Sequence, residues 1–181
     1  MWSLDLFQVE SILLQTHWVL VVMDQFTRRI IGFGVYTGAV DGVALCRMLN
    51  QVIAGQGLPG RLSLDHDPPF EFARWQANSR ILEVEPIQTL PYVPRSHPFI
   101  EWLIGTLRRE YLGCCFFWNA HDLEKKRETF RHDYNQSRVH QGLDGDAPDE
   151  VAGARPVQQA SLYDYAWLSH CNGLFELPIA A

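Results

Sequence analysis

The sequence predicts an α/β domain with a five-stranded mixed sheet flanked by helices. Three strand-like segments come first, at residues 2–9, 17–24 and 29–36, and only a short connection joins the second to the third. Such a connection favours an antiparallel hairpin. Helical and strand-like segments then alternate, which is typical of parallel strands joined by crossover helices.

The predicted strands have residue types suited to a pleated surface. The first segment alternates loosely between apolar and polar residues, and the next two are rich in Val, Ile and aromatic side chains. Two shorter strands are predicted at 61–65 and 86–90. Pro91 and Pro94 break the chain after the last of them.

Four helices are predicted between and after these strands. The first follows Asp41, a favourable N-cap residue, and its apolar residues recur at helical spacing until Gly55 and Gly57 end it. Ser96 and Pro98 suit the start of the third helix. The other helices are expected at 70–82, 96–112 and 122–134.

A single core domain is expected, because 181 residues suffice for one compact core. We assign it to residues 1–143. Residues 144–181 are predicted to be a loop-rich C-terminal tail, since glycine and proline recur every few residues in its first part.

The composition is that of a soluble globular protein, with 47% hydrophobic and 20% charged residues. No apolar run approaches the roughly 20 residues that span a bilayer, and no signal peptide is recognisable, so we expect a cytoplasmic protein without membrane contact. The four cysteines match no zinc-binding spacing and are expected to be free, buried thiols in a reducing compartment.

The charge distribution bears on possible nucleic-acid partners. A net charge of −6 argues mildly against DNA as a partner. However, residues 90–140 carry eight basic and six acidic side chains, whereas the segments on either side are acidic. Any contact with DNA is therefore expected within this segment.

Three acidic residues stand where a carboxylate is costly. Asp5 lies inside an apolar strand, Asp65 ends another strand, and Glu101 lies near a helix start. A cluster of buried carboxylates needs a cation to neutralise it, and Mg²⁺ or Mn²⁺ prefers such oxygen ligands. Taken singly, the three have ordinary alternatives: a strand-edge charge, a turn former and a first-turn helix acid.

The helix that bears Glu101 strengthens the functional interpretation. Apolar residues form one stripe along it, and Arg108 follows Glu101 by two helical turns on another face. This acid and base are either a plain surface pair or a metal ligand beside a phosphate-binding group. The stripe consists of Ile100, Leu103, Ile104, Leu107 and Tyr111.

These features resemble the integrase-like transposases of bacterial insertion sequences, which are relatives of the retroviral integrase core. The matching blocks are residues 2–5, 21–32, 64–67, 97–110 and 134–143, and 35 residues separate Asp65 from Glu101. The resemblance extends from Trp2 to about Asp149. Its specificity comes from the order and spacing of the blocks together.

The resemblance implies a ribonuclease-H-like fold and a DDE recombinase that cuts and joins DNA. It implies that Asp5, Asp65 and Glu101 are catalytic and hold two divalent ions, with homo-oligomers acting on DNA. Basic residues of the positive segment are candidates for DNA contact, although those near 125–131 are equally well explained as a solvated helix face. The candidates are Arg108, Arg109, Lys125, Lys126, Arg138 and His140, with Arg127 and Arg131 as further possibilities.

The sequence departs from the family pattern in three respects. Asp67 stands where relatives often have glycine and is followed by Pro68-Pro69; Trp102 stands where many have a polar or basic residue. The family's helix-turn-helix region is also absent, so additional DNA-binding parts are expected outside this chain. The rival hypotheses are a nuclease that cuts without joining, an inactive remnant that serves as a DNA-binding or oligomerisation module, and a purely structural domain.

Overall fold

The computed structural model describes residues 1–54, 56–65, 67–88, 98–153 and 165–180, without the side chains of 165–168 and 175–180. A five-stranded mixed sheet has the order β3-β2-β1-β4-β5. Strands β1, β2 and β3 are antiparallel neighbours, and β4 and β5 extend the sheet in parallel from β1. Their bounds are Trp2–Glu10, Thr16–Asp24, Ile30–Thr37, Arg61–Leu64 and Glu85–Gln88.

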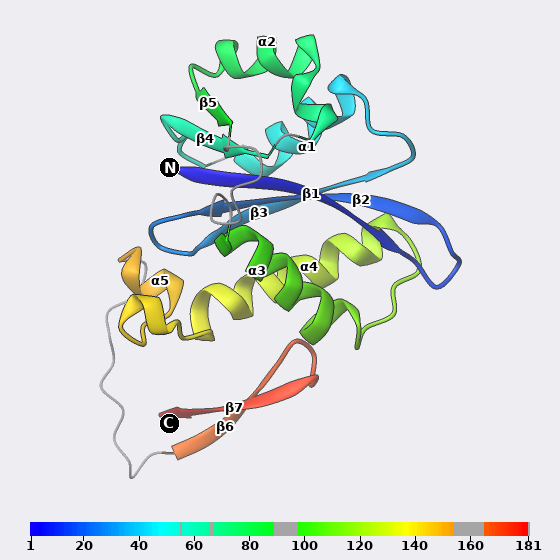
Figure 1. Ribbon diagram of the computed structural model, residues 1–181. Coiled ribbons are helices and arrows are strands. Elements are labelled where there is room, and N and C mark those ends of the chain that lie inside the picture. Colours follow the sequence, from blue (N-terminus) through cyan, green and yellow to red (C-terminus); the bar gives the residue numbers. More distant parts are fainter. Residues whose placement is uncertain (55, 66, 89–97, 154–164, 181) are drawn as a thin grey trace.

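Helices cover both faces of this sheet (Figure 1). One face carries α1 (Gly42–Ile53) and α2 (Ala73–Ile81), and the other carries α3 (Pro98–Thr106) and α4 (Ala120–Ser137). This arrangement confirms the predicted α/β class and the ribonuclease-H-like fold with its five-stranded sheet. The predicted N-cap of α1 is also present, since Asp41 accepts a hydrogen bond of 2.8 Å from the Ala44 N–H.

Alternating residues of the central strands build two hydrophobic cores. Val19, Val21 and Met23 of β2 pack with α3 and α4, whereas Leu20 and Val22 pack with α1 and α2. Successive side chains of a strand point to opposite faces, so a run of apolar residues in β2 serves both cores. The predicted apolar stripe of α3 is confirmed, because Ile100, Leu103, Ile104, Leu107 and Tyr111 are all buried.

Two predicted helices differ in detail from the structure. The segment expected at 70–82 consists of a short 3-10 helix, η1 (Pro68–Glu71), followed by α2. The helix expected at 96–112 is α3 followed by a wider π-helical segment, η2 (Leu107–Leu112), and its predicted cap, Ser96, lies outside the described residues. The wider turn alters the residue spacing beyond Thr106, which helical periodicity in the sequence did not reveal.

The C-terminal segment has more regular structure than predicted. It contains η3 (Gln141–Leu143), α5 (Pro148–Val151) and an antiparallel hairpin of β6 (Tyr165–His170) and β7 (Phe175–Ala180). The hairpin turn includes Asn172-Gly173, both with positive φ, which is a hairpin signal that the prediction of a loop-rich tail overlooked.

Asp133 of α4 attaches this hairpin to the core. Its carboxylate accepts hydrogen bonds of 2.8 Å from the Cys171 N–H and 3.0 Å from the Cys171 thiol. His170 Nδ1 lies 3.2 Å from the same carboxylate. All four cysteines are free thiols, as predicted, but the expectation that they are buried is correct only for Cys171; Cys114 is exposed, and Cys46 and Cys115 are half-buried. Among the described helices, none has the length and apolar character needed to traverse a bilayer.

Candidate active site

The site predicted from the sequence lies where β1, β4 and α3 come together. Strands β1 and β4 are parallel, with Ser3 opposite Ser63. Asp5 and Asp65 each follow that pair by two residues, so the chain brings them to the same level of the sheet. Because Leu4 and Leu6 point toward α1 and α2, the Asp5 side chain between them points to the face covered by α3.

Among the three predicted ligands, Asp5 has a carboxyl group whose pKa is strongly raised. Burial is the largest cause that raises the pKa of its carboxyl from 3.8 to about 7; the charges of Asp67, Asp65 and Glu101 also raise it, and a hydrogen bond from the Leu6 N–H lowers it. That hydrogen bond, from Leu6 N to Asp5 Oδ1, measures 2.7 Å. A carboxyl with this pKa is only about half ionised in a neutral solution unless a cation stabilises its charged form.

The other two predicted ligands are exposed and lie at the rim of the site. Asp65 directly follows β4, and Glu101 lies in the first turn of α3. Both are close enough to Asp5 to raise the pKa of its carboxyl. Nevertheless, within the described parts of the chain, no three His, Cys, Asp or Glu side chains are close enough to hold one metal ion. The three carboxylates therefore share an electrostatic environment without converging on a point.

Asp67 is an additional member of this acidic group, and the sequence analysis had noted it only as a departure from the family pattern. It contributes the largest of the charge effects on Asp5, and burial, followed by the charge of Asp65, raises its own pKa. The spacing of Asp65 and Asp67 was the available signal, since residues two apart in an extended segment share a side.

The predicted DNA-contacting residues fall into two groups. Arg108 and Arg109 are exposed on η2, and the Arg108 guanidinium lies 5.2 Å from the Phe7 ring of β1. Arg138 forms an ion pair with two hydrogen bonds to the carboxylate of Glu110, which also lies on η2. Lys125 and Lys126 lie at the other end of α4, about 20 Å from Arg138 at 1.5 Å per helical residue.

Several of these basic groups already have partners in the protein. Lys126 Nζ lies 2.8 Å from Asp122, and Arg131 pairs with Glu128. Arg127 is buried, with 1% of its surface exposed, and its guanidinium lies against the Phe33 ring. The suggestion that Arg127 contacts phosphate is therefore wrong, because its position on α4 faces the core. Burial lowers its pKa to about 9.

His140 lies between aromatic rings and carries no charge at neutral pH. Its ring makes edge contacts with Trp102 at 5.6 Å and Tyr134 at 5.3 Å. Burial, followed by the charges of Arg138 and Arg28, lowers the pKa of the imidazole to about 4. A phosphate contact by His140 would therefore be a neutral hydrogen bond.

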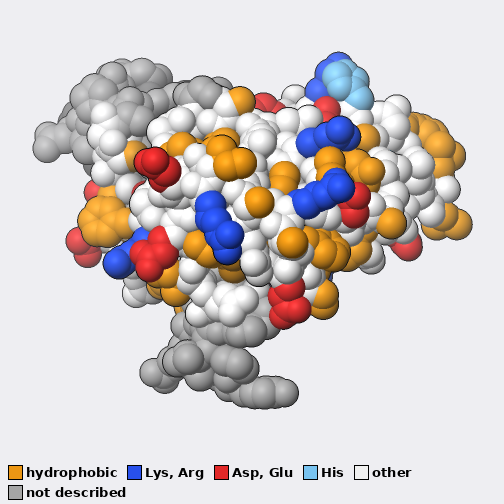
Figure 2. Space-filling model, turned by 90° about the horizontal axis from the view of Figure 1, so that it is seen from above, with side chains coloured by type: hydrophobic (Ala, Val, Ile, Leu, Met, Phe, Trp, Pro, Cys, Tyr) orange, Lys and Arg blue, Asp and Glu red, His pale blue; other side chains and the backbone are white. Residues whose placement is uncertain are grey.

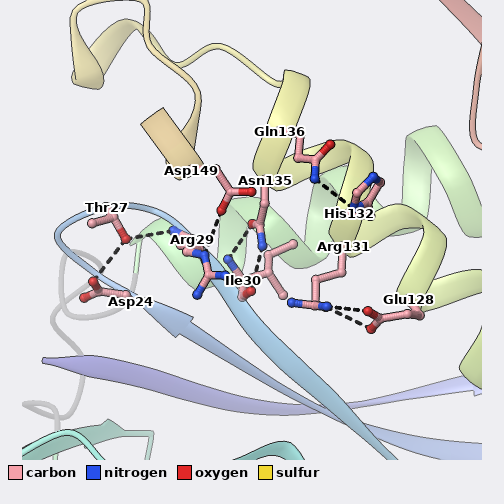
Figure 3. Close-up of polar contacts among 10 residues, drawn as sticks. All are labelled: Asp24, Thr27, Arg29, Ile30, Glu128, Arg131, His132, Asn135, Gln136 and Asp149. Carbon is pink, nitrogen blue, oxygen red and sulfur yellow. Dashed lines mark hydrogen bonds and ion pairs between the residues drawn. The ribbon is translucent and has the colours of Figure 1, made fainter. Parts of the chain in front are cut away.

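Asn135 holds the edge strand of the sheet in place (Figure 3). Its side-chain amide donates to the Ile30 carbonyl at 2.9 Å and accepts from the Ile30 N–H at 2.8 Å. Beside it, Arg29 Nε lies 2.8 Å from the Asp149 carboxylate of α5. These contacts give Asn135, which belongs to the matching block at residues 134–143, a packing role.

Replacing Asn135 with Ala is expected to lower the free energy of unfolding by about 2–4 kcal/mol. The change leaves the buried N–H and carbonyl of Ile30 without partners in an edge strand. Urea unfolding followed by circular dichroism measures the effect. Gln136→Ala, at the next and less buried position, is the control and should cost at most about 0.5 kcal/mol. Equal effects of the two substitutions would contradict the conclusion that Asn135 holds Ile30 in place.

On the face covered by α1 and α2, the residues that the structure describes show no concentration of positive charge. Viewed from above, acidic, basic and apolar side chains are interspersed over the visible surface (Figure 2). The described basic residues that the sequence analysis associated with DNA belong to η2, α4 and the segment after α4. The side that carries α3 is therefore the better candidate for DNA contact.

Comparisons with known proteins agree with this fold and with part of the sequence. Residues 82–148 match the model of the integrase core domain family. The chain is 29% identical over 137 residues to an uncharacterised 31.7 kDa protein of insertion element IS407 from Burkholderia multivorans. That match covers 74% of this chain and 48% of the relative, so the chain spans about half the relative's length.

Solved structures with the same fold are integrase cores or contain integrases. A chain of the simian T-cell lymphotropic virus intasome, solved with PP2A regulatory subunit B56 gamma, has a TM-score of 0.70 and 15% identity over 95% of this chain and 63% of its own length. The HTLV-2 integrase catalytic core with magnesium has a TM-score of 0.61 and 16% identity, covering 83% of this chain and 93% of its own. The BIV integrase core has a TM-score of 0.58 and 18% identity, covering 83% and 91%.

The fold is thus that of the integrase catalytic cores. The resemblance to DDE integrases and transposases, inferred from the sequence blocks, is confirmed by the family match, the insertion-element relative and the structural neighbours. The chain is thus similar in sequence to the integrase core domain family over residues 82–148, and its fold is similar to that of solved integrase catalytic cores.

Proposed function

We propose that this chain is the catalytic core of a DDE recombinase that cleaves and joins DNA strands with divalent metal ions. The observation that carries the proposal is the position of Asp5. Its half-buried carboxyl lies near three further carboxylates, and burial, together with their charges, raises its pKa to about 7. A divalent cation supplies that charge.

The chemistry of the donor groups fits Mg²⁺ or Mn²⁺, because all of them offer hard carboxylate oxygens. Asp5, Asp65 and Glu101 would hold the two ions, with Asp5 between the others. When bound, such ions convert a water or a DNA 3′-hydroxyl into a nucleophile and stabilise the leaving oxygen of the phosphodiester.

The chain's own residues would orient DNA around this site. Arg108 and Arg109 are exposed on the segment that continues α3 beyond Glu101, so they are suited to bind phosphates near the reacting bond. Arg138, Lys125, Lys126 and His140 would add contacts farther away. The HTLV-2 core is described in trimeric and dimeric forms, and we expect this chain likewise to act as a homo-oligomer on DNA.

A metal titration is the direct test of the site. Mn²⁺ binding, followed by electron paramagnetic resonance, should show two ions taken up by the chain, weakened at least about tenfold by Glu101→Gln. Asp144→Asn, at an exposed carboxylate after η3, is the control and should bind like the original chain. Absence of Mn²⁺ uptake, with and without DNA, would overturn the proposal.

An inactive integrase-like module for DNA binding or oligomerisation is the second candidate function. It is favoured by the separation of the three carboxylates among the described residues, and by Asp67 at the family's glycine position. The same titration distinguishes the two functions, since this module would bind DNA without taking up metal. A strand-transfer assay separately distinguishes a recombinase from a nuclease that cuts without joining.

A further inference from the structure

A cavity of about 310 Å³ lies beside the first turn of α3, the turn that carries Glu101, and is lined by other residues. This volume is at the lower end of the range of small-ligand pockets, about 300–1,000 Å³. Phe99 and Trp102 on α3 form one wall and are 43% and 44% exposed. The other principal lining residues are Met23, Arg28, Tyr134 and His140.

The indole ring of Trp102 is held in place by its neighbours. The His140 ring meets it edge-on at 5.6 Å, and the Arg138 guanidinium lies 5.1 Å from its centre. Tyr134 supports His140 from the core side, with ring centres 5.3 Å apart. An aromatic ring that is both fixed and nearly half exposed can stack with a flat ligand at little cost in conformational entropy.

The cavity has basic groups at its edge. The Arg28 guanidinium, from the turn between β2 and β3, stacks on the Phe99 ring at 3.0 Å. Arg138, at the Trp102 side, is paired with Glu110. Arg28 itself donates a hydrogen bond to the Gln25 carbonyl, which fixes its side chain. Aromatic surfaces beside guanidinium groups are typical of sites where bases stack and phosphates are neutralised.

We propose that this cavity receives an unpaired nucleobase of the DNA strand whose phosphodiester lies at the candidate active site. The inference rests on the proposed function, since Glu101 lies between Phe99 and Trp102 in the sequence of α3. A base has two flat faces for stacking against Trp102, and its own phosphate would lie near Arg28. Base stacking tolerates any sequence, so the site would hold frayed DNA ends without selecting a base.

A fluorescence titration of the full chain tests the proposal. The probe is a short duplex with a few unpaired nucleotides at one end, one of them 2-aminopurine, whose emission changes when it leaves the strand stack and packs against an aromatic ring. We expect the chain to bind this probe about tenfold more tightly than the same duplex fully paired. Trp102→Ala should remove that preference, whereas Trp102→Phe should keep most of it.

Two further variants separate the possible explanations. Trp118→Ala removes an indole that is 58% exposed near the start of α4 and should leave the preference unchanged. Glu101→Gln should retain base binding even if metal uptake and strand transfer are lost, so failure of the proposed chemistry is distinguishable from failure of this pocket. Thermal unfolding of each variant confirms that the fold is intact.

Two outcomes would overturn the proposal. The first is that the chain binds the duplex with unpaired nucleotides and the fully paired duplex equally tightly, or that Trp102→Ala keeps the original preference for unpaired nucleotides. The second is a change in the oligomeric state of Trp102→Ala by sedimentation velocity without any change in base binding. In that case the cavity accepts an apolar segment of a second copy of the chain.

Discussion

Replacing Asp65 with Asn is expected to reduce strand cleavage and strand transfer at least about a thousandfold, because a lost metal ligand removes charge stabilisation worth several kcal/mol. Asp65 is the proposed ligand that directly follows β4, and Asn retains its size but not its negative charge. The fold should be unaffected, since the side chain is exposed. A gel assay on labelled DNA ends with Mg²⁺ or Mn²⁺ measures both reactions.

The matched control for this loss is Asp144→Asn, which makes the same chemical change at an exposed residue with a left-handed backbone that Asn readily adopts. It should react at the original rate. If Asp65→Asn cleaved and joined DNA strands at a rate within about tenfold of the original chain, the assignment of Asp65 as a metal ligand would be wrong. Loss of both reactions in the control would indicate damage to the fold rather than to chemistry.

Replacing Asp5 with Asn is expected to stabilise the metal-free protein at pH 8 by about 2–4 kcal/mol while abolishing its activity. The pKa of Asp5 is raised from 3.8 to about 7 in the folded protein. An unfolded chain therefore releases this proton at lower pH than the folded one, which costs the folded state stability as pH rises. Asn has no such charge and still accepts the Leu6 N–H.

The pH dependence gives this prediction a clear sign. Below about pH 3 the carboxyl is protonated in both states, so the original protein and Asp5→Asn should be about equally stable. Their difference should grow between about pH 3 and 7 and then remain constant. Urea unfolding with a chelator at pH 4.5 and 8 measures it.

Divalent metal provides the second arm of the Asp5 experiment. An ion that binds only the folded state should stabilise the original protein at pH 8 and leave Asp5→Asn nearly unchanged. If the original protein were more stable than Asp5→Asn at pH 8 without metal, the conclusion that burial raises the pKa of Asp5 would be wrong. If metal stabilised both equally, the ion would bind elsewhere.

Sequence periodicity was sufficient to predict the principal elements of the core. The apolar spacing of the segment after Asp41 and the stripe that begins at Ile100 both reflect local geometry, because helix and strand repeats are set by neighbouring residues. The hairpin β6–β7 was not predicted, because the glycine and proline residues of this segment indicate loops, whereas the hairpin depends on the Asn172-Gly173 turn. The three acidic residues were predicted because a charged carboxylate is energetically unfavourable in apolar surroundings, and because 35 residues separate Asp65 from Glu101.

The sequence by itself thus determined the fold class of this protein and the principal strands and helices of its core, whereas the three carboxylates stay a prediction. Only the tertiary structure decided that Asn135 holds Ile30, 105 residues away, that Arg127 is buried, and that Trp102 and Phe99 line a cavity with Arg28. The reason is that burial and pKa depend on which distant segments pack together. Local patterns indicate which face of an element is apolar, but not what covers it.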